Sequence, residues 1–148
     1  MIKIICVGKI KETFFKEAVQ EYQKRLTKYV KMEIIEVADY ATTDASEKEA
    51  EHILKYIKEE DYIITLEIEG ENLSSVEMSK IIEKQMINSR NIVFIIGGST
   101  GLSDKVKRIS NFSLSFSKLT FPHQLFRVML LEQIYRSFKI IKNETYHK

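Results

Sequence analysis

The sequence predicts an α/β domain in which helices cover both faces of a mostly parallel sheet. Strand-like and helix-like patterns alternate along the whole chain, as they do in parallel sheets with helical connections. The strand-like runs are also continuously apolar, which is typical of strands buried on both faces. No linker and no internal repeat interrupts the pattern, so we expect residues 1–148 to form one domain of ordinary size.

The first half of the chain contains two expected strands and two expected helices. Residues 2–7 and 34–37 are the apolar strands. Between them, apolar side chains recur at steps of three and four, which predicts an amphipathic helix (Phe15, Ala18, Val19, Tyr22, Leu26 and Tyr29). Ser46 and Glu49 have the spacing of a capping box, so we expect the next helix to begin there.

The second half continues the alternation. Ser74 and Glu77 form another capping-box pattern, which predicts a helix that starts after Ser74. Ser103 is expected to cap a short helix, and Pro122 suits the first turn of a final helix that ends near Phe138. The strands of this half are expected at residues 62–66, 92–96 and 112–116.

Composition excludes several classes of protein. Hydrophobic residues make up 44% of the chain and charged residues 30%, which excludes a disordered or low-complexity chain. The single cysteine, Cys6, cannot form an intrachain disulfide. The longest apolar runs are far shorter than the roughly 20 residues of a membrane span, and the N-terminus begins a strand at once rather than a signal peptide. We therefore expect a cytoplasmic protein.

Charge is unevenly distributed. Residues 102–148 hold nine Lys and Arg against three acidic residues, a net charge of +6. The remaining 101 residues hold fourteen basic and eighteen acidic residues, a net charge of −4. A basic C-terminal third on an acidic body suggests a surface that faces a polyanion, although a solvated cationic face would have the same composition.

The carboxyl ends of three strands are candidate ligand-binding segments, because open α/β sheets bind ligands there. Residues 97–101 after the fourth strand are glycine-rich, which allows a close backbone approach, although a plain tight turn is the commoner explanation of such a segment. Residues 116–122 after the fifth strand combine aromatic and hydroxyl side chains with a proline, where Thr120 would also serve as a helix cap. Glu67, Glu69 and Gly70 after the third strand either border the same crevice or form a solvated turn.

The final helix has apolar residues on all sides, so it must be buried. In a domain of this size, a second subunit is an economical cover, and we expect a homodimer with Arg127 and Arg136 in or beside the interface. Complete burial within one chain is the alternative. The pattern of the tail after this helix predicts a frayed end.

Other reactive side chains form no recognisable site. No metal-ligand spacing occurs in the sequence, so we expect no metal. His52 lies in a charged helix, and Ser99 and Ser117 lack a His/Asp partner pattern, which argues against a hydrolase triad.

Taken together, three segments resemble one family. They are residues 96–102, residues 114–124, and residues 132–136 together with the terminal Tyr146, His147 and Lys148; residues 3–12 and 65–67 fit as well. The chain resembles the SPOUT methyltransferases, in particular the RlmH (YbeA-type) ribosomal RNA pseudouridine-N3 methyltransferases, from its first residue to its last.

This resemblance implies a C-terminal trefoil knot, a homodimer, and S-adenosyl-L-methionine as the methyl donor. The expected substrate is a pseudouridine in a stem-loop of the large ribosomal RNA on the assembled ribosome. Matching motif positions imply a cofactor site made of nine residues (Leu66, Gly97, Gly98, Phe116, Ser117, Lys118, Leu119, Thr120 and Phe121).

Catalytic roles are hypotheses based on the chemistry of the tail. A protonated imide nitrogen is a poor nucleophile, so a base must help remove the N3 proton. We assign this role to His147, with Tyr146 positioning the base and Arg136 or Lys148 binding phosphate or the ring oxyanion. Arg127, Arg136 and Lys148 are the expected RNA contacts, and His123 is a second candidate base. A ribosome-binding factor without activity and an enzyme that binds a phosphorylated nucleotide at Gly97 remain the alternatives.

Overall fold

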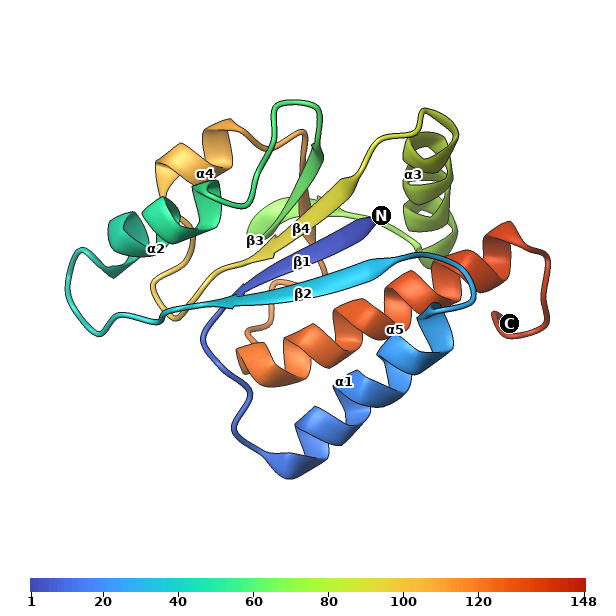
Figure 1. Ribbon diagram of the computed structural model, residues 1–148, viewed down its shortest axis with the longest axis horizontal. Coiled ribbons are helices and arrows are strands. Elements are labelled where there is room, and N and C mark those ends of the chain that lie inside the picture. The colour runs from blue at the N-terminus through green and yellow to red at the C-terminus, as the bar shows by residue number, and fades with distance from the viewer.

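The computed structural model describes residues 1–148, and its five strands form one parallel sheet (Figure 1). The strands stand in the order β2-β1-β4-β3-β5. The elements along the chain are β1 (Ile2–Val7), α1 (Thr13–Leu26), β2 (Met32–Val37), α2 (Ala45–Leu54), β3 (Tyr62–Asn72), α3 (Ser75–Ile87), β4 (Ile92–Ile96), α4 (Asp104–Arg108), β5 (Phe112–Ser115) and α5 (His123–Ile141). The predicted α/β class is confirmed.

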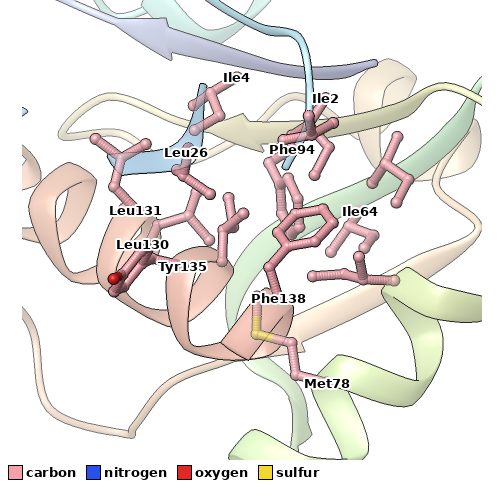
Figure 2. Close-up of a cluster of buried hydrophobic side chains, with 14 of the residues drawn as sticks. Ile2, Ile4, Leu26, Ile64, Met78, Phe94, Leu130, Leu131, Tyr135 and Phe138 are labelled. Atoms are coloured by element: carbon pink, nitrogen blue, oxygen red, sulfur yellow. The ribbon is translucent and has the colours of Figure 1, made fainter. Parts of the chain in front are cut away.

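Helices cover both faces of the sheet, as the apolar strands indicated. On one face α1, α3 and α5 enclose the larger core, which includes Ile4, Phe94 and Leu130 (Figures 1 and 2). On the other face α2 and α4 cover a smaller core around Ile5, Val93 and Ile95. Every residue of β4 is buried, and each large aliphatic side chain there contributes about 1.5–3 kcal/mol to folding. The most apolar strand, β4, therefore lies in the middle of the sheet, where helices cover both of its faces.

The third strand is longer than the sequence predicted. Leu66 and Glu71 both pair with Leu114 of β5, so residues 67–70 bulge out of the ladder. Gly70 ends the bulge, where a Cβ atom would lie 2.7 Å from the Ser113 carbonyl oxygen. A glycine is required by this close approach, which holds the bulge against β5.

Three of the four predicted helix starts are confirmed, and the one at Ser46 is wrong. Ser74 and Glu77 form the predicted capping box, and the Ser103 hydroxyl accepts a hydrogen bond from the Lys105 amide. Ser46 does not cap α2, because Asp44 is the N-cap residue and the Glu49 side chain instead accepts a hydrogen bond from the Tyr40 amide at 3.1 Å. Pro122, not Thr120, precedes α5 as its N-cap residue.

Arg127 corrects one prediction about the final helix. Its side chain is only 2% exposed and faces the interior of the protomer. There its Nη1 atom lies 2.6 Å from a Glu36 carboxylate oxygen, and its Nη2 donates to the Gly8 carbonyl oxygen at 3.1 Å. Arg127 is therefore not placed to contact RNA or a second subunit, and it instead joins α5 to the ends of β1 and β2.

Three neighbouring contacts strengthen this connection. Glu36 also accepts the Ile10 amide at 3.0 Å, the Gln124 side chain accepts the Lys11 amide at 2.9 Å, and the His123 Nδ1 atom lies 3.2 Å from the Val7 carbonyl oxygen. The segment that leaves β1 is thus fixed to the first two turns of α5.

The final helix is covered mainly by its own chain. It lies against the sheet between α1 and α3, and its Leu130 and Leu131 side chains belong to the larger core (Figure 2). Leu130, Leu131 and Ile134 have no exposed surface. Leu125, Val128 and Met129 are only half-buried. Burial within the chain therefore explains one side of the all-round apolar pattern and leaves an outward side incompletely covered. No helix of the protein is long and apolar enough to span a bilayer.

The Glu36–Arg127 pair predicts a pH-dependent contribution to stability. Burial alone would raise the pKa of Glu36, but the hydrogen bonds from Arg127 and from the Ile10 amide hold this pKa below the ordinary value of 4.5. Its stabilising contribution is therefore present above pH 4.5 and is lost as the pH falls through the lowered pKa. At pH 7, Glu36→Gln should reduce the free energy of unfolding by on the order of 1 kcal/mol, since Glu36 is partly exposed and solvent weakens the pair.

Urea denaturation at pH 7 and pH 3 measures this effect. Glu33→Gln, an exposed position on the same strand, is the matched control and should change stability at neither pH. The difference between wild type and Glu36→Gln should shrink at pH 3, and an equal difference at both values would contradict the assignment.

Candidate active site

A crevice of about 370 Å³ opens at the carboxyl ends of β3, β4 and β5. These are three adjacent strands of a parallel sheet, so the segments that follow them leave at one edge. Its wall consists of the bulge of β3, the glycine-rich loop after β4 and the segment between β5 and α5. His123 and Phe126 of α5 also line it. This edge is where the sequence placed the candidate ligand-binding segments.

Most residues expected to bind a cofactor line this crevice. Eight of the nine are on its wall (Leu66, Gly97, Gly98, Phe116, Ser117, Leu119, Thr120 and Phe121). Lys118 is exposed and does not line it. The glycine-rich loop is also a tight turn, because the Gly101 amide donates to the Gly98 carbonyl at 3.1 Å and Gly101 has a φ of 78°. The two interpretations of this loop are therefore compatible.

Sequence reasoning missed several residues of the wall, including Ile68, Lys107 and Phe126. Ile68 lines the crevice because it lies in the bulge of β3, and no local sequence pattern indicated this bulge. Glu67 and Glu69, considered from the sequence only as a bordering loop, also line the crevice. Lys107 belongs to α4, the helix that follows the glycine-rich loop after β4.

The charges on the wall favour a cationic ligand. Glu67 and Glu69 contribute two carboxylates, and Lys107 contributes one ammonium group whose Nζ atom lies 4.0 Å from Glu67. The Thr65 hydroxyl donates to Glu67 at 2.6 Å, which fixes this carboxylate at the rim. A phosphate group would be repelled by the excess negative charge, so the crevice is poorly suited to a phosphorylated nucleotide.

The remaining wall combines apolar side chains, hydroxyl groups and accessible backbone. Leu66, Leu114, Phe116 and Leu119 offer surfaces for a planar ring, and the peptide groups at Gly97 and Gly98 are not shielded by a Cβ atom. These residues fit S-adenosyl-L-methionine, because its adenine is planar and its sulfonium carries a positive charge. No group of three or more His, Cys, Asp or Glu side chains is placed to hold a metal ion.

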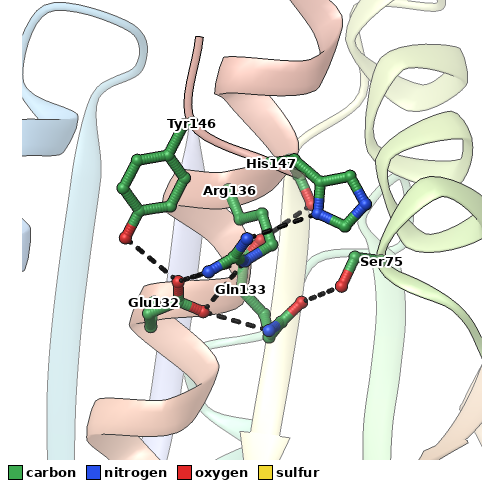
Figure 3. A network of polar contacts seen from close by, with 7 residues as sticks. Ser75, Glu132, Gln133, Arg136, Tyr146 and His147 are labelled. Carbon is green, nitrogen blue, oxygen red and sulfur yellow. Dashed lines mark hydrogen bonds and ion pairs between the residues drawn. The ribbon is translucent and has the colours of Figure 1, made fainter.

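The residues assigned catalytic roles form a second group, on α5 and the tail (Figure 3). Arg136 forms an ion pair with Glu132 at 2.6 Å, and the Tyr146 hydroxyl donates to the same carboxylate at 3.1 Å. The Arg136 guanidinium also lies 4.8 Å from the centre of the Tyr146 ring. Burial raises the pKa of Tyr146, and the adjacent Glu132 carboxylate adds to this, so the phenol stays protonated. The tail is therefore folded against α5, and the expectation of a frayed end is wrong.

The contact between Arg136 and His147 defines the state of the imidazole. The Arg136 Nη1 atom lies 3.3 Å from His147 Nδ1. A guanidinium can only donate, so Nδ1 accepts and is the basic nitrogen, while Nε2 carries the proton. His147 is exposed, and neither it nor Arg136 lines the crevice of this protomer.

Fewer basic side chains of the C-terminal third are unpaired than its composition suggested. Five of its nine basic side chains form ion pairs with acidic residues (Lys105, Lys107, Arg127, Arg136 and Lys139). Four have no ion-pair partner within the protomer (Arg108, Lys118, Lys142 and Lys148). The surface charge available to a polyanion is consequently smaller than +6.

The fold and the crevice define an α/β protein with a ligand site at the carboxyl edge of its sheet, and comparison with known proteins identifies the class. A family profile described as "Predicted SPOUT methyltransferase" matches residues 1–147. The structure of a probable methylase family protein from Haemophilus influenzae shares the fold, with a TM-score of 0.56 and 11% identity over 99% of this chain and 70% of that one.

The chain belongs to the SPOUT methyltransferase family. Curated relatives match over their whole length. The ribosomal RNA large subunit methyltransferase H of Caldicellulosiruptor saccharolyticus is 51% identical over all of both chains. The protein of the same name from Clostridium botulinum strain Kyoto is 52% identical, and a putative one from Methanococcus vannielii 55%, each over 99% of both chains.

Gly97 provides a direct test of the crevice. A Cβ atom at this position would lie 3.0 Å from the Leu102 side chain and 3.1 Å from the Gly101 carbonyl carbon, so Gly97→Val must displace the loop that forms the wall. We expect the affinity for S-adenosyl-L-methionine to fall at least about 100-fold, because this displacement removes the close backbone approach. Isothermal titration calorimetry measures the affinity.

The matched control is Ala38→Val, which places the same valine side chain at an exposed position after β2. Thermal unfolding of both variants separates a local effect from loss of the fold. Unchanged cofactor affinity in folded Gly97→Val would exclude this crevice as the cofactor site.

Proposed function

We propose that this protein transfers a methyl group from S-adenosyl-L-methionine to N3 of a pseudouridine in large-subunit (23S) ribosomal RNA on the assembled ribosome. The observation that carries the proposal is identity above 50% over the whole chain to relatives named ribosomal RNA large subunit methyltransferase H. The acidic and apolar crevice supports it independently, because its chemistry suits a sulfonium cofactor.

Within the crevice, each wall has a distinct role. Bound S-adenosyl-L-methionine supplies an electrophilic methyl group, so that neither a metal nor a covalent enzyme intermediate is needed. Leu66 and Leu119 hold the adenine between them, and the backbone at Gly97 and Gly98 and along residues 116–121 orients the rest of the molecule. Glu67 and Glu69 favour the positively charged ligand over its neutral product.

On the RNA side, the group formed by Arg136, Tyr146 and His147 prepares the nucleophile. His147 accepts the N3 proton through Nδ1, which requires this nitrogen to leave Arg136 when the base arrives. Arg136 then remains beside the ring and stabilises the negative charge that develops on it. Its pKa is raised by the hydrogen bond with Glu132, so the guanidinium keeps its charge. Tyr146 holds the tail against α5 and thereby positions His147.

A homodimer completes this arrangement. Leu125, Val128 and Met129 on the outward side of α5 are half-buried in the protomer, and a second copy would cover them. Because His147 and Arg136 do not line the crevice of their own chain, the dimer would place the tail of one subunit over the crevice of the other. Arg136 and Lys148 would bind RNA phosphates, with an affinity that falls as the salt concentration rises. This activity places the protein with ribosomes in the cytoplasm.

Mass mapping of ribosomal RNA tests the proposed function. RNA from cells that lack the gene should miss one methyl group at a pseudouridine of the large subunit, and purified protein with S-adenosyl-L-methionine should restore it on assembled ribosomes. Identical maps with and without the gene would contradict the proposal. A protein that binds ribosomes without binding the cofactor would instead be the inactive ribosome-binding factor.

Replacing His147 tests the role of the tail. His147→Ala should lower the single-turnover methylation rate by about 100- to 10,000-fold, the usual contribution of general acid–base catalysis. Its affinity for S-adenosyl-L-methionine should stay unchanged, because His147 acts on the base and is not part of the wall of its own chain that holds the cofactor. His52→Ala on α2 is the matched control, and full turnover by His147→Ala would remove the tail from the mechanism.

A further inference from the structure

The cofactor crevice extends past the expected adenine site to the side of β1. Leu66 and Leu119 belong to β3 and to the segment after β5, whereas β4 has β1 as its other neighbour in the sheet. His123 lines the crevice and also contacts the end of β1, where its Nδ1 atom lies 3.2 Å from the Val7 carbonyl oxygen. Gly98 packs against Val7 as well. Gly98 and His123 therefore form a β1 end of the crevice, where the part of the cofactor beyond the adenine and ribose can lie.

His123 offers an unused nitrogen atom at the β1 end. A carbonyl oxygen can only accept, so Nδ1 carries the proton and donates it to the Val7 carbonyl. In the neutral imidazole, Nε2 then has a free lone pair, and no other group of the chain bonds to this ring. A ligand at the β1 end thus meets one hydrogen-bond acceptor whose ring is held by the backbone of β1.

A buried carboxylate lies behind the same end. Glu49 of α2 is only 2% exposed; its Oε2 atom accepts the Tyr40 amide, and its Oε1 atom has no hydrogen-bond partner. A Cβ atom on Gly98 would lie 3.3 Å from Oε1 and 3.5 Å from Oε2, so the Gly98 backbone separates this carboxylate from the crevice. Buried polar atoms are nearly always paired, so an unpaired carboxylate oxygen beside a ligand crevice indicates a place for a cationic group.

The charges next to Glu49 increase this preference. Asp39 adds a second carboxylate: its Oδ2 atom lies 3.8 Å, and the His123 Cε1 atom 3.4 Å, from the position that a Cβ atom on Gly8 would take. Burial raises the pKa of Glu49 and the Asp39 carboxylate adds to this, whereas the Tyr40 amide and His123 lower it. A positive charge at the β1 end would stabilise the ionised form of Glu49, so the binding free energy favours a cation there.

The amino-acid part of S-adenosyl-L-methionine contains a suitable cation. Its α-ammonium group has one positive charge and three N–H donors, as a lysine ammonium has. The sulfonium has no N–H to donate, and the α-carboxylate would be repelled by Glu49 and Asp39. The ammonium group therefore complements both the lone pair of His123 and the negative charge behind Gly98.

We propose that His123 is a cofactor-binding residue whose Nε2 atom accepts a hydrogen bond from the α-ammonium group of the methyl donor, and that the buried Glu49 favours this group through its negative charge. Glu49 acts across the Gly98 backbone and does not touch the ligand. The proposal rests on the proposed function and adds to it how the amino-acid part is recognised. It assigns His123 to the methyl donor rather than to the N3 proton, which leaves the base to the tail of the other subunit.

Calorimetry with three thioether ligands tests the proposal. S-adenosyl-L-homocysteine has both the ammonium and the carboxylate, its decarboxylated form has only the ammonium, and methylthioadenosine has neither. His123→Ala should weaken binding of the first two by about 10- to 100-fold, because a hydrogen bond to a charged group is lost, and leave methylthioadenosine within about 2-fold. Tyr56→Ala, which removes an exposed ring beside the start of β1 at the opposite edge of the sheet, is the control and should bind all three ligands as wild type does.

Glu49→Gln tests the charge alone. The amide keeps the shape of the side chain and can still accept the Tyr40 amide, so the fold should be retained. Its affinity for the two ligands with an ammonium group should fall by about 3- to 10-fold, and its affinity for methylthioadenosine should not change. Glu51→Gln, at an exposed position on the same helix, is the matched control. Glu49→Gln provides the test if His123→Ala does not fold.

The outcomes separate this inference from the proposed function. Equally weaker binding of all three ligands, or unchanged binding, by folded His123→Ala would overturn the contact with the ammonium group. Weaker binding of S-adenosyl-L-homocysteine alone would assign His123 to the carboxylate and also overturn it. Unchanged affinities in Glu49→Gln would overturn the role of the buried charge. Wild-type protein that binds none of the three ligands would instead overturn the cofactor site and the proposed function with it.

Discussion

Burial of β4 on both faces is the constraint on which the rest of the molecule depends. Helices must cover each side of a strand whose residues are all apolar, so the chain crosses over the sheet and every strand runs in the same direction. The carboxyl ends of β3, β4 and β5 then meet at one edge. The crevice lies at this meeting point, which is where open α/β sheets bind their ligands.

The final helix connects this crevice to the rest of the protein. At its beginning, Arg127 and the neighbouring His123 and Gln124 bind the segment that leaves β1. At its middle, Glu132 accepts hydrogen bonds from Gln133 and from Tyr146 of the tail, and Arg136 one turn later contacts His147. One rigid helix thus spaces three groups along its length, so the position of His147 relative to β5 depends on α5 rather than on the tail itself.

The fold was largely readable from the sequence, because strand burial and capping patterns are local signals. The bulge of β3 was not readable, since it is set by the approach of Gly70 to the β5 backbone, a contact between segments far apart in the chain. The trefoil knot stays a prediction from the family. Eight of the nine expected cofactor residues line the crevice because they lie at or after strand ends, and only Lys118 does not line it.

The errors at Arg127 and the tail have a common cause. Charge and terminal position predict exposure on average, whereas Arg127 is held inside by Glu36 and Tyr146 is held by Tyr135 and Glu132. Both depend on partners that no short window contains. Gln133 shows the same effect, because the hydroxyl that bonds to its side chain belongs to Ser75, more than fifty residues earlier in the chain.

The central claim is that the loops after β3, β4 and β5 enclose a methyl donor beside the base to be methylated. A crystal structure with S-adenosyl-L-methionine tests this most directly. The account predicts the adenine between Leu66 and Leu119 and the transferable methyl group directed toward the opening of the crevice, where a base can reach it. A crevice that stays empty at saturating ligand, or is filled by side chains in every copy, would contradict it.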